Sequence, residues 1–284
     1  MLAYFNGDYL QEEKIRISPN DRGFLFADGI YDVIRVYNGQ PYRLDDHLAR
    51  LSYSASQLRL AQTDFSFLAA ATRRLLAEND LTGAATVYWQ ITRGCAAPRK
   101  HSFPKPPPPL TIYGAAQPLD ESRLRQQQEQ GITAITVSDN RWARCDIKAT
   151  ALTANIMANQ EATESAADEA IFIRDGALLE GSHTNIMAVV DGELRTAPLS
   201  NYILPGVTRK AVLELCRELA ITVREMPVFQ NEIPRLAELM ALSTTLEVTP
   251  VITLDGQPVA DGLPGPITRR LGQALRDKIT QFCG

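Results

Sequence analysis

The stretch "DNRWARCDIKATALTANIMANQEA", residues 139–162, holds the residue on which the assignment of the fold depends. Lys148 stands between a loop and a long run of small, neutral side chains, and no other charged residue follows it before Glu161. It therefore lacks a charged partner at helical spacing in the segment ahead of it. The ordinary interpretation is an exposed lysine at the start of a helix. The alternative is a partly buried amine that forms a Schiff base.

The composition is that of an ordinary globular protein. Of the 284 residues, 45% are hydrophobic and 22% are charged, and the formal net charge is −4. This small charge argues against a nucleic acid or an anionic membrane as partner. The N-terminus "MLAYFNGDYL" does not have the pattern of a signal peptide, and no stretch approaches the roughly 18 apolar residues of a membrane span. We therefore expect a cytoplasmic enzyme.

The cysteines and histidines do not form a metal-binding pattern. No CxxC pair occurs, and the three histidines lie far apart in the sequence, so a zinc site is not expected. In a reducing cytoplasm all four cysteines should be free thiols. Cys145 lies close to Lys148 in the sequence, and we interpret it as a packing residue rather than a nucleophile.

The first part of the chain mixes strands with two helices. Residues 31–39 are β-branched and aromatic and end in Asn-Gly, a strong hairpin signal. Further strands are expected at 85–94 and 109–118, and the apolar spacing predicts helices over 44–60 and 64–80. Between the last two strands, "RKHSFPKPPPPL" holds five prolines, which predicts an exposed loop without regular structure.

The stretch "AAQPLDESR" (115–123) is the best candidate for a domain boundary. Beyond it the pattern restarts with a strand at 131–139, followed by a helix expected after Lys148, another at 206–219 and a closing helix at 265–279. Between these helices, strands are expected at 169–176, 185–192, 193–198, 238–244 and 247–256. The sequence thus predicts an α+β protein with domains 1–118 and 119–284 and a site between them.

Several short motifs could together bind one phosphorylated ligand. "EGSHTN" (180–185) is a polar turn with one acid, and "LPGVTRKAV" (204–212) opens a helix whose first amides are free to bind an anion. "LSTTLEVTP" (242–250) adds hydroxyls, and Arg50 could clamp a phosphate. Pyridoxal phosphate needs a lysine for its aldehyde, an acid for its ring nitrogen and a cradle for its phosphate.

With these residues in place, the chain resembles the fold-type IV pyridoxal-phosphate enzymes and, within them, the bacterial D-amino acid aminotransferases. The resemblance rests on seven ordered motifs, at 21–39, 47–51, 90–104, 141–148, 179–186, 203–209 and 243–251. It implies a smaller N-terminal α/β domain and a larger C-terminal pyridoxal-phosphate-binding domain with a β-barrel-like core, with the cofactor between them.

The resemblance also assigns roles to single residues. Lys148 would hold the cofactor as a Schiff base and then move the proton, and Glu180 would pair with the pyridine nitrogen. Arg50 would bind the phosphate. The cradle would be completed by the amides of Val207 and Thr208 with Ser243 and Thr244.

Substrate choice follows from "PRKH" (98–101), which matches the R-x-H pattern of D-amino acid aminotransferases at Arg99 and His101. In that subfamily these residues reach across a dimer interface and join Tyr31 to bind the substrate α-carboxylate. The resemblance thus implies a homodimer that transaminates D-amino acids of the D-alanine and D-glutamate type with 2-oxo acids.

Three alternatives stay open at this point. They are a branched-chain L-amino acid aminotransferase, an aminodeoxychorismate lyase of the same fold, and a cofactor carrier without turnover. Two positions depart from the D-specific pattern, because His183 and Ala149 stand where serine is frequent. Both departures leave the side-chain preference open.

Overall fold

The computed structural model describes residues 1–283, which form two compact units. The first unit comprises Met1–Leu119, Ile147–Ala151 and Cys283. The second comprises Asp120–Asp146 and Leu152–Phe282. The segment Ile147–Ala151, which contains Lys148, thus belongs to the first unit. The sequence instead predicts a single boundary between residues 118 and 119. The predicted domain boundary stays a prediction, and each unit is described by itself.

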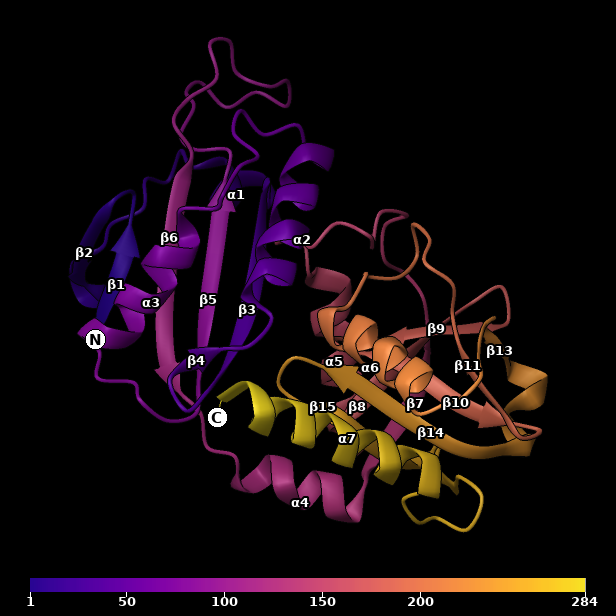
Figure 1. Ribbon diagram of the computed structural model, residues 1–284. Helices are drawn as coiled ribbons and strands as arrows, with labels where there is room; N and C mark the ends of the chain where they lie inside the picture. Colours follow the sequence, from indigo (N-terminus) through magenta and orange to yellow (C-terminus); the bar gives the residue numbers. More distant parts are fainter. Residues whose placement is uncertain (284) are drawn as a thin grey trace. The chain divides into compact units, whose positions relative to one another are not determined.

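The first unit contains a six-stranded antiparallel sheet with the strand order β2-β1-β6-β5-β3-β4 (Figure 1). Its strands are β1 Leu2–Phe5, β2 Asp8–Gln11, β3 Gly29–Tyr37, β4 Gln40–Pro41, β5 Ala85–Thr92 and β6 Thr111–Pro118. The expected hairpin is confirmed, because β3 turns into β4 through Asn38 and Gly39, whose φ angles are +47° and +71°. Positive φ at both positions is what a tight hairpin turn requires.

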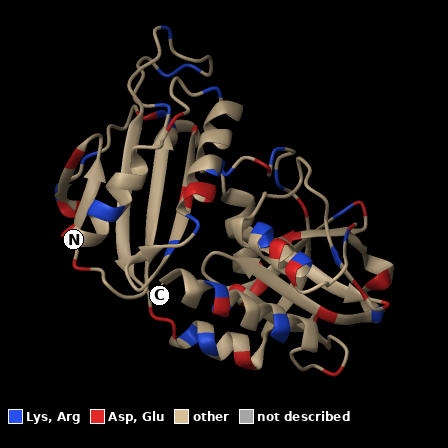
Figure 2. Ribbon diagram, viewed as in Figure 1, with Lys and Arg blue, Asp and Glu red and all other residues tan. Residues whose placement is uncertain are grey.

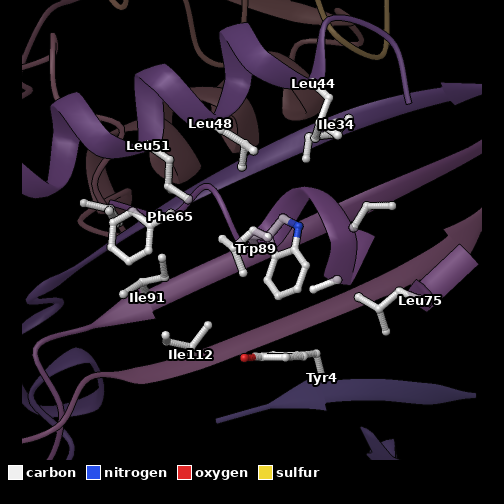
Figure 3. Close-up of a cluster of buried hydrophobic side chains, with 14 of the residues drawn as sticks. Tyr4, Ile34, Leu44, Leu48, Leu51, Phe65, Leu75, Trp89, Ile91 and Ile112 are labelled. Atoms are coloured by element: carbon white, nitrogen blue, oxygen red, sulfur yellow. The ribbon is translucent and has the colours of Figure 1, made fainter. Parts of the chain in front are cut away.

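Two helices, α2 Leu44–Gln57 and α3 Leu68–Glu78, pack on this sheet and bury its apolar side chains. This unit also contains the short helix α1 Arg22–Phe26 and a 3₁₀ turn at Glu12–Lys14. Figure 3 shows side chains of α2 above β3 and β5, with Trp89 at the centre. Trp89 is fully buried, and its indole N–H donates to Thr72 Oγ1 at 3.0 Å. It lies opposite Gly114 on β6, where an added Cβ would stand 2.3 Å from the indole. The two predicted helices and three predicted strands of this part are confirmed.

The helix expected after Lys148 forms, but residues 148–150 do not belong to it. Residues 148–150 run beside β3, with Tyr31 N–H donating to Lys148 O and Thr150 N–H donating to Gly29 O, each at 3.0 Å. Thr150 Oγ1 also donates to the carbonyls of Ala27 and Gly29. Helix α5 begins only at Thr153. Backbone pairing to β3 overrides the helical preference of the small residues.

The second unit contains a closed ring of six strands, β10-β14-β15-β7-β8-β9, because β9 also pairs with β10 through Glu180 and Asn185. The ring strands are β7 Ile132–Ser138, β8 Glu169–Arg174, β9 Ala177–Gly181, β10 Asn185–Val190, β14 Leu236–Ser243 and β15 Glu247–Leu254. Four further strands pair outside the ring, β11 Glu193–Thr196, β12 Val223–Glu225, β13 Val228–Phe229 and β16 Gln257–Pro258. The predicted barrel-like core is confirmed.

The helices of the second unit are α4 Ser122–Gln130, α5 Thr153–Glu164, α6 Val207–Glu218 and α7 Pro266–Cys283, and a 3₁₀ turn spans Gln230–Arg235. Helix α4 was not predicted, because in "SRLRQQQEQ" only Leu124 is apolar and no stripe marks a buried face. No helix in residues 1–283 is long and apolar enough to span a membrane. In the same range, no three His, Cys, Asp or Glu side chains converge as metal ligands.

Candidate functional site

In the first unit, Lys148 and Tyr31 are brought together by strand pairing. The main chain of Lys148 is held on one side by Tyr31 N–H and on the other by Ser54, whose Oγ accepts from Lys148 N at 3.1 Å. The half-buried Lys148 side chain then places Nζ 3.4 Å from Tyr31 Oη and 4.4 Å from the centre of the phenol ring. A lysine amine is thus fixed beside a phenol on β3.

Arg50 of α2 is buried against Asp32 of β3. Its Nε and Nη2 donate to the two carboxylate oxygens at 2.9 and 2.8 Å, and His47 Nδ1 lies 2.8 Å from Asp32 Oδ1. Burial alone would raise the pKa of Asp32, but the charge of Arg50 and the contact with His47 bring it far below its usual range. Burial lowers the pKa of His47, despite its contact with Asp32, so the imidazole is neutral at pH 7. The Arg50 guanidinium is therefore held in one orientation by a buried carboxylate.

Asp32 and His47 were missed as site residues by the sequence reasoning. The alternation of side chains along β3 could have revealed Asp32. It lies on the same inward face as Ile30 and Ile34, which are both fully buried. A charge on that face requires a buried partner. His47 and Arg50, three residues apart on α2, provide two.

Arg99 and His101 lie in the loop between β5 and β6, and both are exposed. Figure 2 shows the basic residues of this loop in blue. The guanidinium of Arg99 lies 4.3 Å from the centre of the Phe26 ring, and the His101 ring is 5.4 Å from the same ring. No hydrogen bond joins either residue to Lys148 or Tyr31 within the described part of the chain. The predicted carboxylate trap is therefore not assembled within one copy of the first unit.

In the second unit, Glu180 sits at the closure of the barrel and accepts three hydrogen bonds. Leu204 N–H donates to Oε2 at 2.8 Å, Asn185 Nδ2 donates to the same oxygen at 3.1 Å, and Arg141 Nη1 donates to Oε1. Arg141 is also clamped by Asp139, at 2.9 and 3.0 Å. The buried carboxylate of Glu180 is thereby fixed by donors from three separate segments.

Arg141 and Asp139 were also missed as site residues. Burial would lower the pKa of Arg141, but its hydrogen bond to Asp139 and the charge of Glu180 raise that pKa above its ordinary value. Both residues lie outside helices and strands, so no apolar periodicity marked them. Nearby, burial raises the pKa of the Cys145 thiol to about 11, which suits a packing residue.

The N-terminus of α6 is joined to Glu180 through Asn185. Asn185 Nδ2 donates to Leu204 O at 3.0 Å as well as to Glu180. Gly206 is the extended N-cap residue of α6, and an added Cβ there would stand 2.0 Å from Asn185 Oδ1. No side chain caps the helix among the described residues. The amides of Val207 and Thr208 therefore lie without a side-chain cap at a helix N-terminus, where anions are stabilised.

Ser243 and Thr244 lie in the same unit, at the turn from β14 to β15. Ser243 Oγ accepts from Leu246 N–H at 3.1 Å, and α6 packs against β14, the strand that ends at Ser243. His183, one of the two departures, is half exposed, and its Nδ1 lies 3.3 Å from Glu169 Oε2 and 3.0 Å from Ser182 Oγ. The neighbouring side chains Ser182 and Thr184 donate to the buried carboxylate of Glu169 at 2.6 and 2.8 Å.

Comparison with known proteins places the chain among aminotransferases. The sequence model of the family described as "Amino-transferase class IV" matches residues 29–254. The chain is 39% identical over 283 residues to a D-alanine aminotransferase of Bacillus licheniformis, covering 98% of this chain and 97% of that protein. It is 37% identical over 281 residues to a D-alanine aminotransferase of Staphylococcus haemolyticus, with 98% and 97% covered.

Solved structures share the fold. A branched-chain amino acid aminotransferase from Escherichia coli superimposes with a TM-score of 0.86 at 28% identity, covering 97% of this chain and 92% of that one. A fold IV transaminase from Curtobacterium pusillum gives 0.80 at 22% identity, with 95% and 92% covered. These neighbours confirm the predicted fold class.

Proposed function

The chain belongs to the class IV aminotransferases, and from this premise we propose that it transfers the amino group of D-amino acids, of the D-alanine and D-glutamate type, to 2-oxo acids. Similarity to D-alanine aminotransferases over nearly the full length of both chains carries the choice of substrate. A branched-chain L-amino acid aminotransferase is the second candidate, because such an enzyme shares the fold at 28% identity. The proposal includes pyridoxal 5'-phosphate as cofactor, a homodimer and a cytoplasmic location.

The residues present fit the proposed cofactor. Pyridoxal phosphate, when bound, supplies an aldehyde that reacts with amines and a ring that withdraws electrons from the substrate Cα. In the second unit, Glu180 would pair with the ring nitrogen, and the uncapped amides of Val207 and Thr208 would bind the phosphate. A side chain at Gly206 would collide with Asn185, so only glycine allows the backbone at the start of α6 to pack this closely against Asn185.

The remaining contacts to the phosphate would come from three side chains. Arg50 offers a guanidinium whose orientation is fixed because its Nε and Nη2 donate to Asp32. Ser243 and Thr244 offer hydroxyls at the end of β14.

Lys148 would both hold the cofactor and move the proton. Its main chain is fixed at Tyr31 and Ser54, so only the side chain needs to swing. As a free amine, Nζ would accept the proton that leaves the substrate Cα and later release it. Its place beside Tyr31 Oη supports this assignment, since Tyr31 is also proposed to bind the substrate.

The substrate α-carboxylate would be bound by Tyr31 of one chain and by Arg99 and His101 of its partner. A guanidinium fork matches the geometry of a carboxylate, and the phenol adds a further donor. Arg99 and His101 make no hydrogen bond to Tyr31 within the described part of one chain, and both are exposed. This supports a shared trap and hence a homodimer.

The proposal is tested by reducing the purified protein with borohydride in the presence of pyridoxal phosphate and mapping the modified peptide. We expect the cofactor to become fixed to Lys148, and Lys148→Ala to lose both this label and transamination. Lys14→Ala, at an exposed lysine of the first unit, is the matched control. Attachment to a different lysine would overturn the assignment of Lys148.

A further inference from the structure

The loop between β5 and β6 is held by very few hydrogen bonds of its own. Residues 97–109 include prolines at 98, 104 and 106–109, which have no amide hydrogen to donate. Among the described residues, no backbone–backbone hydrogen bond involves any residue from 97 to 109. A loop of this kind would sample many conformations unless side chains from elsewhere fixed it.

Arg22, the first residue of α1, supplies that fixation. Its side chain is buried, with 4% of the residue exposed. Nη1 donates to Lys100 O at 2.7 Å and approaches Ser102 O at 3.5 Å, while Nη2 donates to His101 O at 3.3 Å. These are the only hydrogen bonds to the backbone of residues 97–109 within the described chain. One guanidinium thus reaches three consecutive carbonyls in the segment that carries Arg99 and His101.

The orientation of Arg22 is set by Asp28, which also pairs with Arg93. Asp28 Oδ2 accepts from Arg22 Nε at 2.8 Å and from Arg93 Nε at 2.8 Å. Arg93 in turn donates to the carbonyls of Leu58 and Arg59, at the end of α2. Asp28 therefore compensates the charge of two buried arginines and ties Arg22 to the packed part of the unit.

Aromatic contacts complete the attachment of the loop. Arg93 lies 3.7 Å from the centre of the Phe103 ring, and Arg22 and Arg99 lie 4.8 and 4.3 Å from the centre of the Phe26 ring. Cation–π contacts are tolerant of direction, so they keep the loop close without fixing its backbone. The hydrogen bonds of Arg22 provide the directional constraint.

We propose that Arg22 is a positioning residue that fixes the backbone of residues 100–102 and thereby sets the placement of the Arg99 and His101 side chains for the substrate α-carboxylate. Arg22 touches neither substrate nor cofactor in this role. The inference rests on the proposed function for its effect on substrate affinity, whereas the effect on the loop itself does not depend on any activity.

The test compares Arg22→Met with Arg22→Lys in the enzyme loaded with pyridoxal phosphate. Methionine keeps the unbranched stem, and lysine keeps the charge but cannot reach Asp28 and three carbonyls at once. Arg16→Met is the matched control, because Arg16 also donates to two carbonyls but is exposed and contacts no residue of the loop. Two readouts are taken, the rate of tryptic cleavage at Arg99 and Lys100, and the KM and kcat for D-alanine.

We expect both Arg22 variants to be cleaved in the loop at least roughly tenfold faster than the wild type. The KM for D-alanine should rise roughly 10- to 100-fold, with a much smaller change in kcat and with cofactor absorbance retained, as expected when a binding group is misplaced by about 1 Å. Arg22→Lys should lie between the wild type and Arg22→Met in both readouts. Arg16→Met should match the wild type.

Unchanged cleavage in both variants would overturn the inference whatever the enzyme's activity. Faster cleavage with an unchanged KM, in an enzyme whose KM does respond to Arg99→Ala, would also overturn it. A wild-type enzyme inactive on D-amino acids would instead refute the proposed function, and the link to substrate with it. If Arg22→Met does not fold, Arg22→Lys carries the same test.

Discussion

Replacing Asp32 by Asn tests the buried charge network that orients Arg50. Asp32 accepts from Arg50 Nε and Nη2, from His47 Nδ1 and from Val33 N–H, at 2.8 to 2.9 Å. Asparagine has nearly the same shape but only one acceptor oxygen, and its amide group would meet the N–H groups of Arg50. The variant therefore removes the negative charge beside a buried guanidinium and about half of the hydrogen bonds that Asp32 accepts from it.

The cost can be worked out from these contacts. Removing one partner of a buried ion pair costs roughly 3–5 kcal/mol, and we take about 3 kcal/mol because asparagine retains some of the hydrogen bonds. For a unit of this size, each kcal/mol lowers the melting temperature by about 4 °C, which gives a decrease of roughly 12 °C. With Arg50 no longer fixed, affinity for pyridoxal phosphate should fall as well.

The dependence on pH follows from the direction of the pKa shift. The pKa of Asp32 is lower in the folded protein than in the unfolded chain, so its stabilisation is fully present above the unfolded value of about 4 and is lost as the pH falls below it. The difference between wild type and Asp32→Asn should therefore be constant near neutral pH. It should shrink in acid.

The assay is thermal unfolding of the apoenzyme by circular dichroism, followed by titration with pyridoxal phosphate. Asp8→Asn is the control, since Asp8 is an exposed carboxylate of the same unit. A melting temperature within about 2 °C of the wild type, together with unchanged cofactor affinity, would refute the claim that Asp32 holds Arg50 in place.

Three further predictions concern other residues of the proposed site. Glu180→Gln should lower kcat by roughly 100-fold while the cofactor stays bound, measured by initial rates and by the absorbance of the bound cofactor. Unchanged turnover would show that a group other than Glu180 pairs with the ring nitrogen. Arg99→Ala should raise the KM for D-alanine by at least roughly tenfold, the equivalent of one charge-assisted hydrogen bond, and an unaltered KM would remove Arg99 from the trap. Because burial raises the pKa of Cys145 to about 11, this thiol should resist iodoacetamide at pH 8 while the exposed Cys95 reacts, and equal labelling by mass spectrometry would contradict its assignment as a packing residue.

Much of the fold was predictable because local signals agreed with the tertiary structure. The Asn38-Gly39 turn placed the β3–β4 hairpin, and the apolar spacing placed α2, α3, α6 and α7. Helix α4 was not predictable in this way, because a polar helix with one buried leucine carries no periodicity. The pairing of residues 148–150 with β3 depends on backbone partners more than a hundred residues away, which no local pattern reveals.

The residues of the candidate site likewise differ in whether the sequence alone identifies them. Residues in distinctive motifs, such as Lys148, Glu180 and Arg99, could be named from the sequence, although their roles stay predictions. Arg141 and Arg22 could not be identified in this way. Arg141 donates to the buried carboxylate of Glu180, and Arg22 donates to three carbonyls of the loop between β5 and β6. Supporting residues of this kind are defined by contacts between distant segments.

The handedness of the substrate is the central claim, and one measurement tests it most directly. Initial rates should be measured for D- and L-alanine, D- and L-glutamate and L-leucine, with pyruvate as acceptor for the glutamates and 2-oxoglutarate for the others. If Tyr31, Arg99 and His101 bind the carboxylate, the D-enantiomers should react, and the L-enantiomers should lose roughly 2–5 kcal/mol of carboxylate binding. We expect turnover of D-alanine and D-glutamate with little or none of the L-amino acids. A preference for L-leucine would contradict the D-specific assignment and favour the branched-chain alternative.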